Sequence, residues 1–254
     1  MEKYAAVILA AGKGTRMNEG LASPIPKVMF ELHGKPIIDW AVQSIKDVGV
    51  NRIVLVVGYK REMIQDYFGD KLEYAIQEEQ LGTGHAVAQA RLLLASQTEQ
   101  VIVFYGDSPL YTPGSIKRLM NMHEEQKATI SMLTVVSPEG DLTGYGRVFR
   151  NELGHVADII EHKDCTPEQL ECREWNPGFY IFNSEWLWSN ISKLEANNAQ
   201  KEYYLTDMIH IAKSQGMRVC ATSVTDENEA LGVNNQEQLK EAEEIITNRD
   251  DLQN

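Results

Sequence analysis

The sequence predicts an α/β fold in which a mostly parallel sheet carries helices on both faces. Three short runs of consecutive apolar residues support this prediction: Tyr4–Ile8, Ile53–Val57 and Val101–Tyr105. A strand that is apolar at every position, rather than at every second one, is buried on both faces. Longer amphipathic segments separate these runs, and strands that alternate with helices are typical of a parallel sheet covered on both sides. The expected architecture is therefore Rossmann-like.

The remaining elements of the first half follow from periodicity and from helix-terminating residues. Pro36 is expected to start an amphipathic helix and Gly49 to stop it, because proline is favoured in the first turn and glycine beyond the last. The same reasoning then predicts a helix over Glu62–Phe68, a strand over Leu72–Ile76, a helix over His85–Ala95, a helix over Ser115–Gln126 and a strand over Thr129–Val136.

The sequence changes in character beyond about Gly144. Shorter apolar runs joined by irregular polar segments predict strands at Tyr145–Phe149, Val156–Glu161 and Phe179–Phe182. We expect them to form a small β subdomain or insertion folded over the edge of the sheet. Two helices (Glu185–Glu195 and Tyr204–Gln215), a strand (Arg218–Ser223) and a terminal helix from Gln236 complete the chain.

Composition limits the possible functions. The 254 residues are 43% hydrophobic and 24% charged, which is ordinary for a water-soluble globular protein. No apolar run is long enough to span a bilayer, and we expect neither a signal peptide nor a membrane partner. The cysteines, Cys165, Cys172 and Cys220, form neither a disulfide framework nor a metal motif, which favours a cytoplasmic location. A net charge of −13 argues against nucleic-acid binding, but local cations can still bind a nucleotide within one cleft.

The segment Leu9–Met17 (LAAGKGTRM) follows the first predicted strand directly. Its two glycines allow the backbone to turn sharply and to present N–H groups that no side chain shields. Lys13 and Arg16 add positive charge within the same few residues. The combination suits a phosphate-rich ligand, although glycines in such a turn can also serve packing alone.

Asp107 and Lys27 are candidates for binding and neutralising phosphate groups. Asp107 comes directly after a buried strand, so its carboxylate is expected at the carboxyl edge of the sheet, where α/β proteins bind ligands. Mg²⁺ prefers one or two protein oxygens together with substrate phosphates. The alternative role for Asp107, capping the next helix, is better suited to Pro113 and Ser115. Lys27 follows two prolines, and a rigid loop holds a cation in a fixed place.

Other polar residues also follow predicted strands. Gln77, Gly82 and Thr83 lie in a second strand-to-glycine-to-helix transition. An amide side chain can pair with the donor and acceptor edges of a base, and it can equally cap exposed backbone. The clusters Glu161–Asp164 and Asn176–Gly178 could line a pocket for a hydroxyl-rich ligand. The histidines are scattered, which argues against a zinc site.

Taken together, these motifs resemble those of the sugar-nucleotide pyrophosphorylases, a family of nucleotidyltransferases. The resemblance is greatest to the uridyltransferase domain of the bifunctional bacterial N-acetylglucosamine-1-phosphate uridyltransferases. The matching segments run through the chain: Leu9–Met17, Pro26–Val28, Glu79–His85, Tyr105–Asp107, Gly144–Arg147, Ile160–Asp164, Glu202–Asp207 and Gly232–Asn235.

The resemblance implies a role for each matching residue. The UTP site would consist of Leu9, Ala10, Ala11, Gly12, Gln77, Gly82 and Thr83. Arg16 and Lys27 would contact the phosphates, and Asp107 with Asn234 would hold Mg²⁺. Tyr105, Gly146, Glu161 and Asn176 would form the sugar site, and Asn235 is expected to cap the terminal helix. One nucleotidyltransferase domain would then cover 1–254, with a nucleotide-binding half (about 1–136), a sugar-binding half (about 137–235) and a terminal helix and tail (236–254).

The implied reaction is the attack of a sugar 1-phosphate on the α-phosphorus of UTP, which releases pyrophosphate. The sequence carries no hexapeptide repeats, so we expect neither acetyltransferase activity nor a trimer formed through such a helix. Asn176-Pro177-Gly178 replaces the usual Asn-Thr-Gly, and the loop before Lys27 is longer than usual. The sugar and the oligomeric state therefore stay open. Alternatives are another sugar phosphate or phosphorylated alcohol as acceptor, CTP as donor, and a nucleotide-sugar sensor without turnover.

Overall fold

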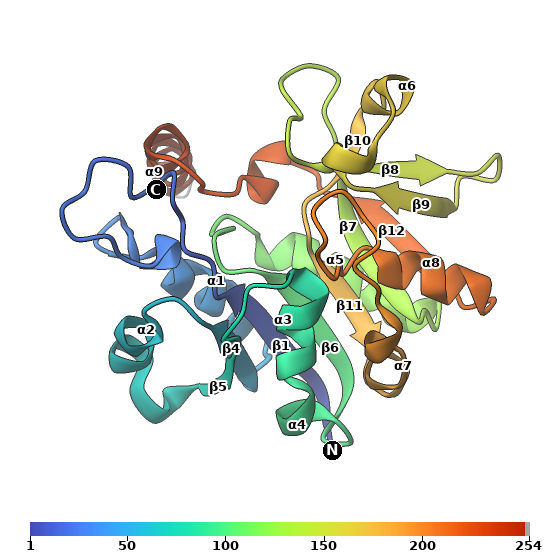
Figure 1. Ribbon diagram of the computed structural model, residues 1–254, viewed down its shortest axis with the longest axis horizontal. Helices are drawn as coiled ribbons and strands as arrows, with labels where there is room; N and C mark the ends of the chain where they lie inside the picture. The colour runs from blue at the N-terminus through green and yellow to red at the C-terminus, as the bar shows by residue number, and fades with distance from the viewer. Residues whose placement is uncertain (252–254) are drawn as a thin grey trace.

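The computed structural model describes the backbone of residues 1–251 and the side chains of residues 1–249. Within this part of the chain, ten strands form one sheet, in the order β5-β4-β1-β6-β11-β7-β10-β8-β9 with β12 beside β7 (Figure 1). The first four, β5 (Glu73–Ile76), β4 (Ile53–Val57), β1 (Glu2–Ala10) and β6 (Thr98–Tyr105), are parallel to one another. The three apolar runs of the sequence thus lie side by side in the sheet, and the parallel arrangement that they predicted is confirmed.

One strand departs from the expected arrangement. We expected Phe179–Phe182 in the subdomain at the sheet's edge, but β11 (Tyr180–Asn183) lies antiparallel between β6 and β7 (Ile130–Val136), in the middle of the sheet. Tyr180, Ile181 and Phe182 are almost completely buried there. A run of apolar residues predicts burial correctly, but it does not say which strands will flank it.

The small β subdomain continues this sheet rather than forming a separate layer. Strand β10 (Glu174–Asn176), which the sequence did not predict, pairs with β7 on one side and with β8 (Gly146–Arg150) on the other. Strand β9 (Val156–Ile160) forms the edge, while β12 (Val219–Ser223) pairs with β7 in parallel. The antiparallel extension is visible at the upper right of Figure 1.

Helices cover both faces of the sheet. Successive residues of β1 pack into different apolar cores, Ala5 and Val7 into one and Ala6 and Ile8 into the other. One face carries α3 (Thr83–Gln89), α4 (Arg91–Leu94), α7 (Ser184–Asn190) and α8 (Asp207–Ser214), and the other carries α1 (Ile37–Lys46), α2 (Arg61–Phe68) and α5 (Pro113–Glu125). The remaining short helix, α6 (Pro167–Leu170), precedes β10.

Two details of these helices differ from the prediction. The single helix expected over His85–Ala95 is divided at Ala90 into α3 and α4. The side chain that caps α5 belongs to Thr112, which accepts a hydrogen bond from the Ser115 N–H, while Pro113 takes the first helical position. Threonine is a good N-cap because its side-chain oxygen accepts from a free N–H of the first turn.

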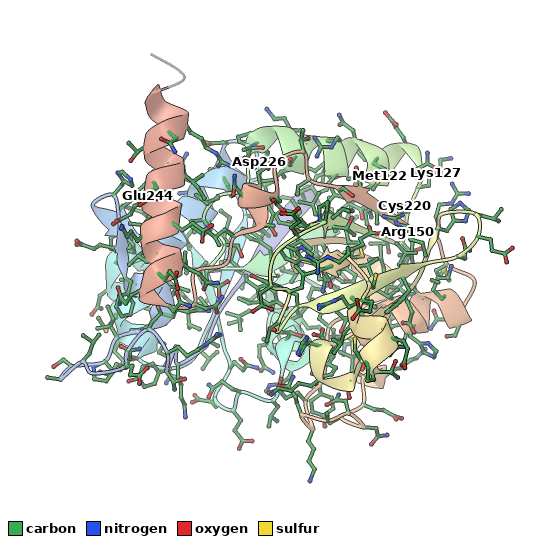
Figure 2. The ribbon with its side chains drawn as sticks, turned by 90° about the horizontal axis from the view of Figure 1, so that it is seen from above. Met122, Lys127, Arg150, Cys220, Asp226 and Glu244 are labelled. Carbon is green, nitrogen blue, oxygen red and sulfur yellow. The ribbon has the colours of Figure 1, made fainter. Side chains whose placement is uncertain are left out.

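The last helix, α9 (Gln236–Asp251), packs against the loop that follows β1. Its Ala242 and Ile246 share a third apolar core with Met17 and with Leu32 of the β2–β3 hairpin (Glu31–Leu32 and Lys35–Pro36). In Figure 2, α9, which carries Glu244, lies at the opposite end of the molecule from β8, which carries Arg150. As predicted, Asn235 caps the helix, because its Oδ1 accepts from the Gln238 N–H at 2.8 Å. No helix within residues 1–251 is long and apolar enough to cross a bilayer.

Candidate active site

Two cavities meet at the carboxyl ends of β1, β5 and β6. The first, of about 230 Å³, is lined by Leu9, Ala10, Ala11, Gly12, Lys27, Gln77, Gly82, Thr83, Tyr105 and Asp107, among others. The second, of about 330 Å³, is lined by residues that include Lys27, Tyr105, Asp107, Gly146, Glu161, Asn176 and Asn234. Because Lys27, Tyr105 and Asp107 belong to both, the structure brings two predicted sets of residues together around one centre. We call these cavities the first and the second cavity.

Among the residues to which the family resemblance gives a role in binding or catalysis, Arg16 is the one that lines neither of the two. It is exposed, and it borders a third, wider cleft that also includes Gly144, Tyr145 and Asn234. This cleft adjoins the second cavity through the shared residues Gly144, Tyr145 and Asn234. A guanidinium on the exposed rim is free to reorient, so Arg16 can contact a ligand that extends out of the two cavities.

Asn18 closes the long loop after β1, a role that the sequence analysis did not predict. Its side-chain amide donates to the carbonyls of Gly14 (3.0 Å) and Ile25 (2.8 Å), and its Oδ1 accepts from the Ile25 N–H (2.8 Å). These bonds join the two ends of the segment from Gly14 to Ile25, which directly follows the exposed residues Gly12 and Lys13. Hydrogen bonds within its own chain therefore support the end of the glycine-rich turn.

Gly14 allows Lys27 to approach this turn closely. Its φ of +63° lies in the left-handed region, and a Cβ at this position would overlap with the Cβ of Lys27. Glycine meets both demands at little cost, whereas any other residue would be strained and would displace the lysine. The second glycine of the motif thus serves mainly to position Lys27.

The ammonium of Lys27 lies between Asp107 and Asn234. It forms an ion pair with the Asp107 carboxylate and donates to the Asn234 Oδ1 at 2.8 Å. The Asn234 amide nitrogen donates to the Gly232 carbonyl at 3.0 Å, which directs its oxygen toward the lysine. A further bond, from the Val233 N–H to the Asp107 carbonyl (2.8 Å), fixes the two segments together. Two oxygens that converge on one cation make a suitable pair of ligands for a divalent metal ion.

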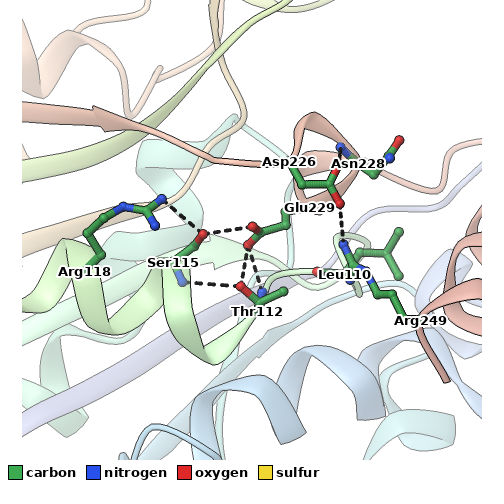
Figure 3. A network of polar contacts seen from close by, with 8 residues as sticks. All are labelled: Leu110, Thr112, Ser115, Arg118, Asp226, Asn228, Glu229 and Arg249. Atoms are coloured by element: carbon green, nitrogen blue, oxygen red, sulfur yellow. Dashed lines mark hydrogen bonds and ion pairs between the residues drawn. The ribbon is translucent and has the colours of Figure 1, made fainter. Parts of the chain in front are cut away.

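A buried carboxylate supports the segment that carries Asn234. Figure 3 shows Glu229 accepting hydrogen bonds from the Thr112 N–H (3.0 Å), the Thr112 hydroxyl (2.8 Å) and the Ser115 hydroxyl (2.9 Å). Glu229 is only 3% exposed. Three donors are enough to stabilise a buried carboxylate, which would otherwise be costly to bury. The start of α5 and the chain leading to α9 are thereby joined, a contact between distant segments that sequence patterns do not reveal.

Gln77 and Gly82 form the far wall of the first cavity. The Gln77 side chain is buried, and its Nε2 lies 3.2 Å from the Gly82 carbonyl and 3.1 Å from the His85 Nδ1. Gly82 has a φ of +110°, and a Cβ there would lie 2.7 Å from backbone atoms of Tyr203. A larger residue at position 82 would therefore displace the chain that closes this cavity.

Glu161, Asn176 and Tyr105 line the second cavity. Glu161 accepts a hydrogen bond from the Thr206 hydroxyl at 2.9 Å, and burial raises the pKa of its carboxyl. The Asn176 Oδ1 accepts from the Gly178 N–H at 3.0 Å, and Gly178 packs directly against the Tyr105 ring. Burial also raises the pKa of Tyr105, so its phenol stays protonated at neutral pH. The cavity thus offers both acceptors and donors to a hydroxyl-rich ligand.

Comparisons with known proteins identify the family and the fold of the chain. A family model described as nucleotidyl transferase matches residues 5–246. Among curated relatives, the bifunctional protein GlmU of Acetivibrio thermocellus is 44% identical over 249 residues, 98% of this chain and 53% of its own length. The same protein of Exiguobacterium sp. strain AT1b is 43% identical over 98% of this chain and 54% of its own length. The chain thus spans about half the length of these relatives.

A solved structure shares the fold of this chain. It is a crystal structure of UDP-glucose pyrophosphorylase complexed with UDP-glucose, which superposes with a TM-score of 0.80 at 19% sequence identity. The superposition covers 98% of this chain and 100% of that one.

Proposed function

The chain belongs to the nucleotidyl transferase family, and on that premise we propose that it transfers UMP from UTP to a sugar 1-phosphate. The favoured acceptor is N-acetylglucosamine 1-phosphate, and the products are UDP-N-acetylglucosamine and pyrophosphate. The observation that carries the proposal is the meeting of two cavities at Lys27 and Asp107. Two anionic substrates, one in each cavity, would have their phosphates at this shared centre.

We assign the first cavity to the nucleotide. The backbone of Leu9, Ala10, Ala11 and Gly12 forms its floor, and exposed N–H groups in such a turn bind phosphate. Gln77 offers an amide to the edge of the base, while Gly82 and Thr83 close the cavity beside it. Arg16, on the exposed rim, would reach the outer phosphates and the departing pyrophosphate.

We assign the second cavity to the acceptor. Glu161 and Asn176 would exchange hydrogen bonds with the hydroxyl and amide groups of the sugar, and Gly146 leaves room for it beside Glu161. Tyr105 contributes an aromatic ring, to which the apolar face of a sugar ring can pack. These assignments make the segment before β8 and the strands β8 to β10 the acceptor-binding part of the chain.

The chemistry requires positioning and charge neutralisation rather than proton transfer. The nucleophile, a phosphate oxygen of the acceptor, is already ionised at neutral pH and needs no general base. Lys27 would bind oxygens of the reacting phosphates and offset the charge that accumulates between two anions. Asp107 and Asn234, which now hold the Lys27 ammonium, provide the oxygen ligands that suit Mg²⁺. Bound there, Mg²⁺ would supply further charge neutralisation.

The test is a pyrophosphate-release assay across UTP, CTP and dTTP and across a panel of sugar 1-phosphates and phosphorylated alcohols, with magnesium present. We expect UTP with N-acetylglucosamine 1-phosphate to give the highest kcat/KM. The Asp107→Ala variant should lose at least about 100-fold in kcat, because a preorganised charge at the reacting phosphates is removed. Asp70→Ala, which removes an exposed carboxylate elsewhere, should match the wild type.

Four results would contradict the proposal or its assignment of Asp107. A higher kcat/KM with CTP would indicate a cytidylyltransferase, and a higher kcat/KM with a phosphorylated alcohol would indicate a different acceptor. Tight binding of UTP and UDP-sugars without pyrophosphate release would indicate a sensor. Normal turnover in Asp107→Ala would show that Asp107 takes no part in the reaction.

A further inference from the structure

The segment Tyr203–Thr206 lies between the two cavities, and we call it the bridging segment. On one side it pairs with the loop that closes the first cavity: the Tyr203 N–H donates to the Leu81 carbonyl (2.8 Å), and the Gly84 N–H donates to the Tyr203 carbonyl (2.7 Å). A third bond joins the Leu205 N–H to the Thr83 hydroxyl oxygen at 2.9 Å. These bonds fix the backbone of the bridging segment up to the residue before Thr206.

On its other side, the bridging segment reaches the second cavity. The Thr206 hydroxyl donates to Glu161 Oε1 at 2.9 Å, and Thr206 itself is only 4% exposed. Thr206 lines neither cavity, so it can act on a ligand only through Glu161.

The two carboxylate oxygens of Glu161 have different surroundings. Oε1 is bound by Thr206, whereas Oε2 lies next to Gly146, where a Cβ would be 3.4 Å away. Without the Thr206 hydroxyl, the carboxylate could rotate and present either oxygen. One fixed donor on Oε1 therefore determines that Oε2 is the oxygen available beside Gly146, Asn176 and the cavity.

We propose that Thr206 is a positioning residue for the acceptor: it orients Glu161 so that Oε2 accepts a hydrogen bond from a sugar hydroxyl. The inference rests on the proposed function and deepens it, because it names a residue that determines acceptor affinity from outside the cavity. The bonds to Leu81, Thr83 and Gly84 give Thr206 the fixed backbone that this role requires.

The test compares Thr206→Val with Thr206→Ser by steady-state kinetics. Valine removes the hydroxyl at almost constant volume, and we expect the KM for the sugar 1-phosphate to rise about tenfold, as for the loss of one hydrogen bond to a charged group. The KM for UTP and kcat should stay close to the wild-type values. Serine keeps a hydroxyl and should restore acceptor KM. Thr98→Val is the matched control, because Thr98 is buried with a hydrogen-bonded hydroxyl at the start of β6, far from Asp107.

The pH dependence gives a second readout that lost packing alone would not change. Burial and the nearby carboxyls of Asp164, Glu202 and Asp207 raise the pKa of Glu161, while the Thr206 hydrogen bond lowers it. In Thr206→Val this pKa rises further, so Glu161 takes up a proton at a higher pH. In the pH profile of kcat/KM for the acceptor, the acidic limb should therefore lie at higher pH in Thr206→Val than in the wild type. The phosphate of the acceptor titrates equally with both proteins, so its contribution to the two pH profiles is the same and cancels when they are compared.

Each outcome of these measurements either supports or overturns the role of Thr206. If the wild type is active and Thr206→Val changes neither the KM for the acceptor nor the acidic limb of the pH profile, this inference is overturned and the proposed function stays intact. Equal rises in the KM of UTP and acceptor would show a general structural role and overturn it too. If the valine variant fails to fold, Thr206→Ala supplies the hydroxyl-free protein. A wild type that turns over no sugar 1-phosphate would instead overturn the proposed function, and with it this inference.

Discussion

Replacing Lys27 by methionine should change metal binding and turnover in opposite directions. In the structure, the Lys27 ammonium takes the position between Asp107 and Asn234 that a divalent ion would need. Methionine has a similar length and no charge, so Lys27→Met removes the competing cation with little change in packing. The free protein should then bind Mn²⁺, a spectroscopic substitute for Mg²⁺, more tightly than the wild type does.

The size of the effect follows from the contacts that the metal must displace. The side chains of Lys27 and Asp107 are only 17% and 15% exposed, so solvent weakens their ion pair less than it would at the surface. A hydrogen bond between charged groups contributes about 1.5–3 kcal/mol. Since about 1.4 kcal/mol corresponds to a tenfold change in affinity, the Kd for Mn²⁺ should fall by about 10- to 100-fold in the variant.

Two measurements check this prediction, isothermal titration calorimetry and the electron paramagnetic resonance signal of free Mn²⁺, both without nucleotide. Lys213→Met is the charge-matched control, because Lys213 is exposed on α8. Turnover of Lys27→Met should meanwhile fall by about 100-fold or more, since a preorganised cation at the reacting phosphates is lost. A Kd for Mn²⁺ equal to that of Lys213→Met, or weaker, would refute the interpretation of Lys27 as a competing cation.

Two further predictions concern the turn and the core. Gly14→Ala should reduce kcat about 100-fold, because the new Cβ displaces Lys27 from the reaction centre. Gly20 is the control, because it also has a positive φ but a Cβ there would have no atom within 4 Å, so the kcat of Gly20→Ala should be unchanged. Equal losses of kcat in the two variants would show that backbone strain alone is responsible. Burial lowers the pKa of His123 from 6.5 to about 4, so the unfolded chain binds a proton that the folded one does not. The free energy of unfolding, measured in urea, should fall by up to about 3 kcal/mol as the pH drops from 6.5 to 4, and His123→Gln should flatten this slope.

Local patterns predicted the parallel half of the fold well for a physical reason. Strands such as β1 and β4 are buried on both faces, so every position must be apolar, and such runs are visible in the sequence. Strand β11 shows the limit of this reasoning. Its apolar run predicted a strand, but its place between β6 and β7 depends on pairing with partners about 50 or more residues away, which no local pattern encodes.

The residues of the candidate site also differ in whether local patterns in the sequence could predict their positions. Asp107 and Gln77 each follow a strand, so the geometry of a parallel sheet was sufficient to predict that they lie near one edge. Asn234 was placed by the family resemblance alone, because the bond from Val233 to the Asp107 carbonyl joins segments far apart in the chain. The roles of Thr206 and Glu229 were missed, since their partners, Glu161 and Thr112, lie 45 and 117 residues away in the sequence.

The replacement at Pro177 is best understood from the turn that contains it. The Asn176 Oδ1 accepts from the Gly178 N–H, so the turn is closed by a bond that bypasses residue 177, and proline, which has no N–H, leaves that bond intact. Gly178, with a φ of +84°, still packs against the Tyr105 ring. The polar groups of the second cavity, Glu161 and Asn176, are therefore retained, and the change substitutes an apolar ring for a hydroxyl on its wall. Hydrogen bonding to the acceptor should thus follow the family, whereas the fit of its apolar substituents is where this chain will differ.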